Sequence, residues 1–261
     1  GSGQLKQGET VELMPVQKPV RIRTLQVHNE KTDTAYAGQR VAVNLQGVEV
    51  SEIKRGYLLA TPAYLTPSYR VDTRLRLLSS SKRTLKNWNR VRFHLGTDET
   101  LGRVVLLDRD ELQPGDETFV QIVMEKPVVA YKGDRFVIRY YSPVATIGGG
   151  IIIDGNAPKQ KRFKEDVLDE LAIKEEGSLY DVVLHELESH PDELMSVDEL
   201  SKLTGSNREQ LKQELQQLVD DEKAILIKDQ VYISSYALEA INAHIVETLD
   251  KYHQKYPMRS G

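Results

Sequence analysis

The stretch Gly133-Asp134-Arg135-Phe136-Val137-Ile138-Arg139, followed by Thr146-Ile147-Gly148-Gly149-Gly150-Ile151-Ile152-Ile153, decides the fold class of this chain. It lies within residues 114–153, whose apolar and polar residues alternate and predict four strands separated by turns. Three consecutive glycines before an isoleucine run predict a close approach of two backbones or a bulge at a barrel corner. The pattern alone indicates an antiparallel β-barrel.

Strands are also predicted upstream of this stretch. Residues 20–27 alternate apolar with polar side chains over eight positions, the clearest strand pattern of the chain. Similar patterns predict strands over residues 9–13, 41–45, 69–77, 91–96 and 100–107. Residues 53–59 close the first group of strands, with a last strand expected after the turn at Arg55-Gly56. The first two thirds of the chain is therefore expected to be all β.

The hydrophobic period changes after residue 157. Apolar residues recur at helical spacing over residues 163–171 and 179–187. Ser196 to Glu199 and Ser206 to Glu209 have the capping-box pattern and predict the starts of two short helices. A hairpin is expected over residues 225–233 and a last helix from residue 237. Helix, helix-turn-helix and hairpin in this order predict a winged helix.

Charge is unevenly distributed along the 261 residues. Residues 1–157 carry 22 Lys and Arg against 17 Asp and Glu, whereas residues 158–261 carry 13 against 22. The basic excess is concentrated between Ser68 and Arg103, with nine basic and three acidic residues. A basic surface favours contact with a phosphate backbone, so the β part of the chain is expected to bind nucleic acid.

Several classes of protein are excluded by composition. The chain has no cysteine, and therefore no disulfide, thiolate metal site or cysteine nucleophile. No apolar run approaches the roughly 20 residues of a membrane helix, and no signal peptide is visible. A cytoplasmic protein without a membrane partner is expected.

The quoted stretch resembles the last hairpin of the third domain of elongation factor Tu-like translation GTPases. There, an arginine-phenylalanine-alanine-isoleucine-arginine strand precedes a threonine-valine-glycine-alanine-glycine strand. The longer form here, from Arg135 through Ser142-Pro143 to Gly150, resembles the bacterial selenocysteine-specific elongation factors (SelB) in particular. Gly38-Gln39-Arg40 before one strand and Arg55-Gly56 before another resemble the second domain of the same factors.

The resemblance implies a multi-domain β plus α fold, with two elongation-factor-Tu-like β-barrels followed by a linker helix and a winged-helix domain. Its expected boundaries are residues 1–62 for a domain II-like barrel lacking its first strands, 63–156 for a domain III-like barrel, 157–176 for the linker helix, 177–235 for the winged helix, and 236–261 for the first helix of a truncated next one.

The function that the resemblance implies is GTP-dependent delivery of selenocysteyl-tRNA to the ribosome at recoded UGA codons. The family's GTPase domain and its RNA-reading winged helices are expected to be missing from this chain. The sequence has no glycine-rich phosphate-binding loop, so the chain itself is not expected to be an enzyme or to hold a cofactor. GTP and magnesium belong to the missing domain. The expected partners are selenocysteyl-tRNA, the ribosome and, through missing domains, a messenger-RNA hairpin, and the chain is expected to be a monomer.

Arg55 matches an arginine that helps to form the selenocysteinyl pocket in the SelB family. A selenolate at neutral pH would favour a fixed guanidinium. The alternative is a structural turn arginine, since elongation factor Tu has the same one. The family's other pocket residues fall in the missing strands.

The basic run around Trp88, the only tryptophan, suits contact with an RNA backbone and stacking. The resemblance implies tRNA backbone contacts from Lys82, Arg83 and Arg90, and from Thr97 in the turn before Asp98. The alternative is a solvated charged loop in which Trp88 plugs the barrel.

The remaining candidates are weaker. His185 and His190 lack a third ligand, and Asp220-Asp221-Glu222 suits a solvated turn, so no metal site is predicted. On the second helix of the winged helix, Arg208 and Lys212 face outward with acidic neighbours, which favours a spacer over a recognition helix. The other function considered, a transcription regulator pairing a barrel with a DNA-binding winged helix, would need a basic winged helix.

Overall fold

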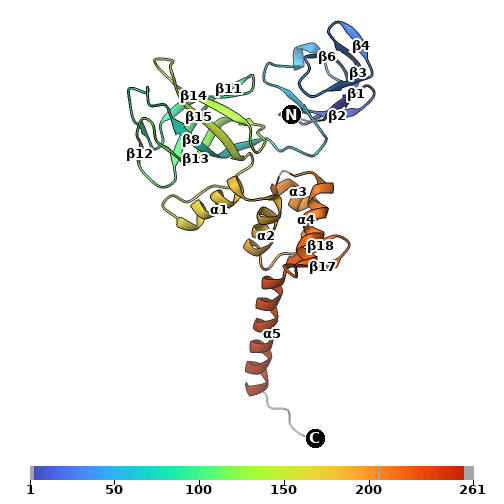
Figure 1. Ribbon diagram of the computed structural model, residues 1–261, viewed down its shortest axis with the longest axis vertical. Helices are drawn as coiled ribbons and strands as arrows, with labels where there is room; N and C mark the ends of the chain where they lie inside the picture. Colours follow the sequence, from blue (N-terminus) through green and yellow to red (C-terminus); the bar gives the residue numbers. More distant parts are fainter. Residues whose placement is uncertain (1–2, 205, 256–261) are drawn as a thin grey trace. The chain divides into compact units, whose positions relative to one another are not determined.

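The structure, a computed structural model, describes residues 3–204 and 206–255. The chain forms two compact units, residues 1–171 and residues 172–261. The first is built mainly from strands, and the second from helices with a small sheet (Figure 1). The change of hydrophobic period near residue 157 therefore marks a real change of architecture.

The first unit begins with strands that surround a small core. The strands are β1 (Gln4–Lys6), β2 (Thr10–Met14), β3 (Lys18–Val27), β4 (Glu30–Thr32), β5 (Thr34–Tyr36), β6 (Val41–Gln46) and β7 (Leu58–Ala60). A sheet of order β4-β3-β2-β7 also pairs β3 with β6, while β1 pairs with β5. The core is formed by Val11, Leu13, Val20, Ile22, Leu25 and Ala35.

The strand predicted over residues 20–27 is confirmed. β3 buries Val20, Ile22 and Leu25, whereas Pro19 and Arg21 are exposed. The turn expected at Arg55-Gly56 and the strand expected after it are confirmed. A short 3₁₀ helix (Val50–Glu52) and a turn at residues 54–57 precede β7, which has only three residues. Gly56 takes a φ of 93° in that turn, and such a conformation favours glycine over an apolar strand residue.

A second set of strands in this unit closes into a barrel of order β10-β11-β13-β8-β15-β14 (Figure 1). The bounds are β8 (Ser68–Leu77), β10 (Arg90–Leu95), β11 (Asp98–Leu106), β13 (Glu117–Val128), β14 (Arg135–Tyr140) and β15 (Thr146–Asp154). β9 (Leu85–Lys86) and β12 (Glu111–Leu112) form a separate two-stranded sheet, and each falls between two barrel strands in the sequence.

Residues 114–153 form three strands, so the prediction of four was wrong. β13 continues through Pro127, and its register with β8 shifts between Val123 and Val128. Proline lacks a ladder donor but is tolerated at such an irregularity. β13 is therefore one strand of 12 residues that pairs with β8 on both sides of the irregularity.

The glycines of β15 meet neighbouring main chains, as predicted. A Cβ on Gly150 would lie 1.8 Å from the Arg74 carbonyl oxygen of β8, and one on Gly149 would lie 2.5 Å from the Phe136 carbonyl oxygen of β14. Neither strand could keep its place beside a larger residue, because these neighbours are backbone atoms. The glycine run is what lets β15 close the barrel between β8 and β14.

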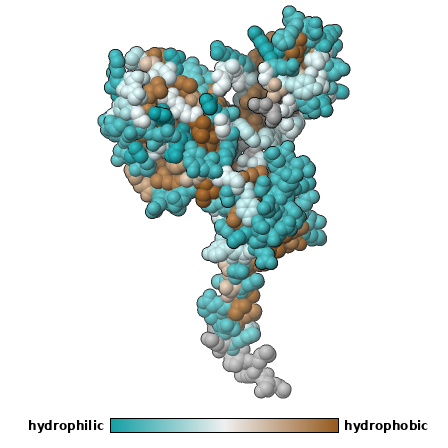
Figure 2. Space-filling view, viewed as in Figure 1, coloured by the Kyte–Doolittle hydropathy of each residue, from teal (hydrophilic) through white to brown (hydrophobic). Residues whose placement is uncertain are grey.

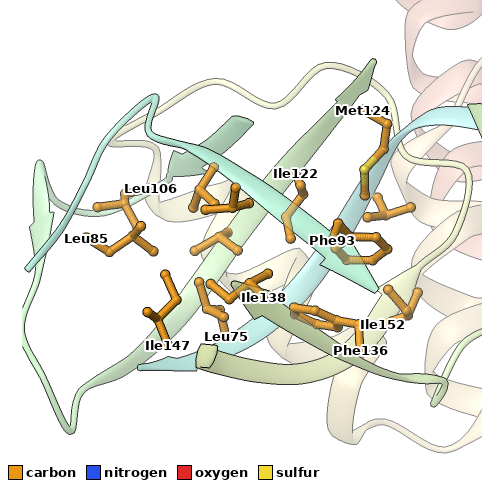
Figure 3. Close-up of a cluster of buried hydrophobic side chains, with 14 of the residues drawn as sticks. Leu75, Leu85, Phe93, Leu106, Ile122, Met124, Phe136, Ile138, Ile147 and Ile152 are labelled. Atoms are coloured by element: carbon orange, nitrogen blue, oxygen red, sulfur yellow. The ribbon is translucent and has the colours of Figure 1, made fainter. Parts of the chain in front are cut away.

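The barrel interior is filled by inward-facing aliphatic and aromatic side chains (Figure 3). Phe93 of β10 and Phe136 of β14 stack with ring centroids 5.1 Å apart. Their strands alternate, so that Val91 and Ile138 also point inward, while Arg92 and Val137, the residues between the inward pairs, point outward. Burial of this kind is worth about 25 cal/mol per Å² of apolar surface, so this core anchors the unit.

Residues 157–163, called the strap below, are fixed to the outside of this barrel. The buried Asp72 carboxylate accepts hydrogen bonds from the side-chain amides of Gln121 (2.8 Å) and Gln160 (2.8 Å). Arg162 donates to the carbonyl oxygens of Leu106 (2.7 Å) and Arg109 (2.7 Å). The strap is therefore part of the barrel structure.

Helix α1 (Glu165–Glu176) follows the strap, as its helical spacing predicts. Leu171 is fully buried in a cluster with Leu107, Phe119 and Ile153 of the barrel. Phe163 does not belong to the helix, because its φ is 57° and its side chain is exposed. The expected linker helix therefore begins on the barrel surface.

The second unit contains α2 (Leu179–Ser189), α3 (Val197–Thr204), α4 (Arg208–Asp220) and α5 (Ser235–Lys255). Its sheet has the order β16-β18-β17, with β16 (Met195–Ser196), β17 (Ala224–Lys228) and β18 (Val231–Ser234). Helices α2, α3 and α4 share a core with the sheet through Val183, Leu187, Leu200, Leu211, Leu215 and Tyr232. Helix and hairpin positions agree with the predicted ones.

Of the two capping boxes, one is confirmed and one is wrong. Ser196 and Glu199 exchange hydrogen bonds at the start of α3, with the Ser196 backbone N–H donating to Glu199 Oε2 (2.8 Å). At α4 the N-cap is Asn207, whose Oδ1 accepts from the Glu209 backbone N–H (2.7 Å). Asparagine is at least as good an N-cap as serine, so it displaces Ser206.

Helix α5 carries apolar side chains on its surface. Figure 2 shows hydrophobic residues among hydrophilic ones along it, and Ile245, Val246, Leu249 and Tyr252 are all about half exposed. No helix in the described part of the chain is long and apolar enough to cross a membrane.

Candidate nucleic-acid interface

A groove on the closed barrel brings together three of the predicted RNA-contact residues. Lys82 and Arg83 come from the loop after β8, and Arg90 opens β10. Tyr140 and Tyr141, at the end of β14, line the same groove. The sequence analysis missed both tyrosines, although two aromatic residues directly after an arginine strand could have signalled them.

Tyr140 holds the loop that carries the basic residues. Its hydroxyl donates to the Arg83 carbonyl oxygen (3.1 Å) and lies 3.3 Å from Ser81 Oγ. The ring is half-buried, so the loop is tied to the barrel through a side chain that is itself fixed. Lys82 and Arg83 therefore project from a held loop.

Some cationic side chains of the groove form ion pairs with acidic residues, and others do not. Lys82 and Arg83 are exposed, and neither forms an ion pair with a residue that the structure describes. By contrast, Lys86 pairs with Glu111 (3.0 Å). The two adjacent free cations are the part of the groove that can attract a phosphate backbone.

Arg90 is fixed by a bidentate pair with Glu125, with both N–O distances 2.7 Å. The hydrogen bonds from Arg90 hold the pKa of Glu125 below its usual value. The guanidinium also lies 4.8 Å from the centre of the Tyr141 ring. Arg90 is thus a preorganised donor whose charge is largely balanced.

The next outward residue of β10 repeats this arrangement. Arg92 donates to Glu99 of β11 (2.5 Å), and this hydrogen bond lowers the pKa of Glu99. Arg92 also lies 5.5 Å from the centre of the Tyr141 ring. Two outward arginines of β10 therefore share the Tyr141 ring, and each has an acidic partner on another strand. The sequence pattern did not reveal these partners, because they are set by strand register.

Trp88 does not plug the barrel, so that part of the alternative is wrong. Its side chain is 51% exposed, whereas Leu85 and Leu106 nearby are fully buried (Figure 3). The indole ring lies 5.6 Å from the Arg103 guanidinium. Trp88 is available on the surface beside the groove.

Thr97 lies in a different place from the other predicted contacts. It is in the exposed turn between β10 and β11, lining a pocket with Gly56 and Arg135. A Cβ on Gly56 would lie 2.7 Å from Asp98 Oδ1, so the Arg55-Gly56 turn fits closely against the Thr97-Asp98 turn. The structure thus separates Thr97 from the basic groove and brings it to the turn of Arg55.

Arg55 is exposed in that turn and forms no ion pair with any described residue. The backbone N–H of Tyr57 donates to the Lys54 carbonyl oxygen (3.1 Å), which closes the turn around it. A guanidinium on a closed turn can accept an anionic group without first breaking a salt bridge.

The helical unit offers a less basic surface. Arg208 pairs with Asp198 (2.8 Å), and the outer groove of α4 mixes Lys212 with acidic and amide side chains. His185 and His190 bond within α2, through Ser189 Oγ (3.3 Å) and the Glu186 carbonyl oxygen (3.0 Å). In the described residues, no three histidine or acidic side chains gather as a metal site requires.

Comparison with known proteins agrees with this architecture. Residues 2–60 match the family "Elongation factor Tu domain 2", and residues 72–159 match "Selenocysteine-specific elongation factor, beta-barrel domain". The two β parts of the first unit therefore match two β domains of translation elongation factors, and among the described strands the second part closes into a barrel.

Relatives specify the class further. The chain is 34% identical, over its whole length, to the selenocysteine-specific elongation factor of Desulfomicrobium baculatum, and covers 41% of that protein. It is 31% identical to that of Escherichia coli K12 over 66% of this chain and 26% of the relative. Within the elongation factors, the chain belongs to the selenocysteine-specific family. The chain spans about two fifths of the length of the relatives that match it from end to end.

Solved structures show the same fold. A bacterial selenocysteine-specific elongation factor EF-Sec matches 97% of this chain with a TM-score of 0.70 at 22% identity, over 39% of its own length. The SelB of Methanococcus maripaludis in its apo form matches 64% of this chain, and 39% of its own, with a TM-score of 0.53 at 23% identity.

Proposed function

We propose that this chain provides the aminoacyl-tRNA-binding barrels of a factor that delivers selenocysteyl-tRNA to the ribosome at recoded UGA codons in a GTP-dependent way. The single observation that carries the RNA-binding role is the groove with Lys82 and Arg83, two adjacent cations without acidic partners in the described part of the chain. The family to which the chain belongs supports the choice of RNA.

The proposed tRNA contacts fall into two patches. Lys82 and Arg83 attract phosphates, and Arg90 donates hydrogen bonds from a fixed position beside Tyr141. Thr97 offers a hydroxyl from the second patch, next to the Arg55 turn. Such contacts fix the position of an RNA helix without reading its sequence.

For Arg55 we propose contact with the selenocysteinyl group. Its guanidinium is exposed and has no ion pair with a described residue, so it can take a selenolate as its counter-ion. This role explains a charged residue at the tip of a turn better than turn stability does, because the backbone hydrogen bond of the turn does not involve the side chain.

The helical unit is proposed to be a winged helix that acts as a spacer. The order α2, β16, α3, α4 and the hairpin β17-β18 is that of a winged helix. On α4, the usual recognition helix, Arg208 is paired with Asp198 and Lys212 has acidic neighbours. A DNA-binding regulator is not supported, since the matched relatives are elongation factors.

The described residues do not fit GTP and magnesium. The main chain of Gly148 to Gly150 pairs with both neighbouring strands, and so cannot cradle phosphates as a loop does. We therefore place nucleotide binding in the part of the longer relatives that this chain does not span. The ribosome, a messenger-RNA hairpin bound elsewhere in the protein, a monomeric state and a cytoplasmic location complete the proposal.

Binding of the chain to selenocysteine tRNA and to a generic DNA duplex, each across a salt series, tests the proposal. We expect preference for the tRNA and a steep fall of affinity with salt. The double variant Lys82→Ala, Arg83→Ala should reduce the salt slope by about 2, roughly one for each lost phosphate contact. The matched control is Lys159→Ala, Lys161→Ala, which removes the same charge from exposed positions of the strap.

The control should leave both slope and affinity nearly unchanged. Equal losses in the two double variants would mean that net charge alone, and not the groove, drives binding. A preference for duplex DNA that survives both sets of changes would overturn the assignment of RNA as the partner.

A further inference from the structure

Trp88 occupies a turn that is held at every residue. The Asn89 backbone N–H donates to the Lys86 carbonyl oxygen (3.1 Å), which closes the turn. Within it, the Trp88 N–H donates to the Val104 carbonyl oxygen (2.7 Å). The side chain of Asn87 accepts from the Leu106 N–H (3.1 Å). The indole therefore projects from a rigid base.

Tryptophan is a poor choice for the backbone conformation of this turn. Trp88 has a φ of 68°, in the left-handed region where glycine and asparagine are favoured. Asparagine, which the chain has on both sides at Asn87 and Asn89, adopts this conformation more readily than tryptophan does. An unfavourable residue held in place by its surroundings points to a role for the side chain.

Arginine accompanies the exposed indole. Arg103 donates to the Trp88 carbonyl oxygen (3.2 Å) and holds its guanidinium 5.6 Å from the ring centre. Arg103 lies opposite Arg90 in the β10–β11 ladder, and Arg90 in turn lies against Tyr141. Two half-exposed aromatic rings are thus connected by two arginines across the edge of the basic groove.

We propose that Trp88, with Arg103, is a stacking platform for an unpaired RNA nucleobase whose neighbouring phosphates occupy the groove. This inference rests on the proposed RNA binding and goes beyond it by naming a second chemistry. A free indole face stacks on any base, and the guanidinium adds a cation–π interaction. A base inside a duplex presents no free face, so the platform selects looped or single-stranded nucleotides.

Trp88 is the only tryptophan of the 261 residues, so its emission reports directly on the platform. The chain is titrated with an unstructured single-stranded oligoribonucleotide and with an RNA duplex of equal phosphate number. We expect the single strand to quench the emission more strongly than the duplex does. Trp88→Ala should weaken single-strand binding roughly tenfold and duplex binding less than twofold, whereas Trp88→Phe should retain most of the preference.

Two outcomes separate this inference from the proposed function. Binding that is weakened by Lys82→Ala, Arg83→Ala, but leaves the emission of Trp88 unchanged and is unaffected in Trp88→Ala, would overturn the platform and leave the groove standing. Quenching that persists in the Lys82, Arg83 double variant would support the platform and count against the groove. Absence of binding to either RNA at low salt would overturn both. Thermal unfolding of each variant, followed by circular dichroism, confirms that the barrel remains folded.

Discussion

In the closed barrel, Gly150 lies against the main chain of Arg74, 76 residues earlier in the sequence, whereas in the helical unit Asn207 caps α4 through a residue two positions away. The barrel depends on pairs of strands that are distant in the chain. The ends of the helices depend on neighbours within a single turn. Both units have buried cores, so the difference lies in the range of the interactions that shape them.

This difference predicts how each unit responds to substitution. A residue that prevents two backbones from meeting in a closed barrel disturbs both neighbouring strands, because every strand has two partners. A lost cap weakens one helix end and leaves the packed core in place. The four changes below test this contrast, starting with the largest expected effect.

The largest effect is expected from Gly150→Val. The added Cβ would lie 1.8 Å from the Arg74 carbonyl oxygen, so β8 and β15 would have to separate. We expect a loss of more than about 4 kcal/mol in the free energy of unfolding, a large part of the total stability of a typical domain. Urea unfolding followed by the emission of Trp88 measures it.

Gly96→Ala is the control for this change. Gly96 has a φ of 56°, but a Cβ there would meet no atom within 4 Å. Only the backbone strain of about 1–2 kcal/mol should appear. If both variants lost the same stability, the close approach of β15 to β8 would not be what requires glycine.

The second effect concerns the strap. Asp72→Ala would remove the buried carboxylate that accepts from the side-chain amides of Gln121 and the half-buried Gln160, and among the described residues only Gln121 would keep a second acceptor, the Pro158 carbonyl oxygen. Hydrogen bonds to a charged group contribute about 1.5–3 kcal/mol, so we expect a loss of about 2 kcal/mol. Amide hydrogen exchange should increase in residues 157–163 more than in β10.

Gln160→Ala removes one donor and keeps the carboxylate, so it should cost less than Asp72→Ala. Exchange that rises equally throughout the barrel would show that Asp72 stabilises the barrel as a whole and does not specifically hold the strap.

The range of the interactions also explains what the sequence could predict. The strand over residues 20–27, the helices α1 to α4 and the Ser196 cap follow from local patterns, and they are confirmed. The number of strands in residues 114–153 was wrong because the bulge at Pro127 depends on the register with β8. Local pattern cannot show where a distant partner shifts.

The same limit applies to the candidate interface. The basic run from Lys82 to Arg92 is visible in the sequence, and the structure places much of it around one groove. Which cations are free is not visible, because Glu125 reaches Arg90 from another strand. The resemblance grouped Thr97 with the basic residues. In the structure Thr97 lies in a different pocket, next to Gly56.

The third effect tests a local interaction. Asn207→Ala removes the side chain that caps α4, at a cost of about 1 kcal/mol. For a unit of this size we expect the melting temperature to fall by about 4–8 °C. Ser206→Ala is the matched control and should change it far less, since Ser206 is not the cap. A larger effect of Ser206→Ala would restore the capping box that the sequence predicted.

The smallest effect is a pH dependence at the start of α3. Hydrogen bonds from the backbone N–H and hydroxyl of Ser196 hold the pKa of Glu199 below its usual value. A carboxyl whose pKa is lower in the folded state stabilises the fold above its unfolded pKa of about 4.3, and loses this contribution as the pH falls through the folded value. Because Glu199 is exposed, the contribution should be only a few tenths of a kcal/mol.

Glu199→Gln isolates this contribution, because glutamine can complete a capping box but does not titrate. At pH 7 the unmodified chain should be slightly more stable than the variant, and the two melting temperatures should converge as the pH falls from about 4.3 through the lower folded pKa of Glu199. A difference that stays constant over this range would mean that the charge of Glu199 contributes nothing and that the cap acts only through hydrogen-bond geometry. Even then the effect would remain confined to one helix end, in contrast to the loss expected when β15 can no longer lie against β8.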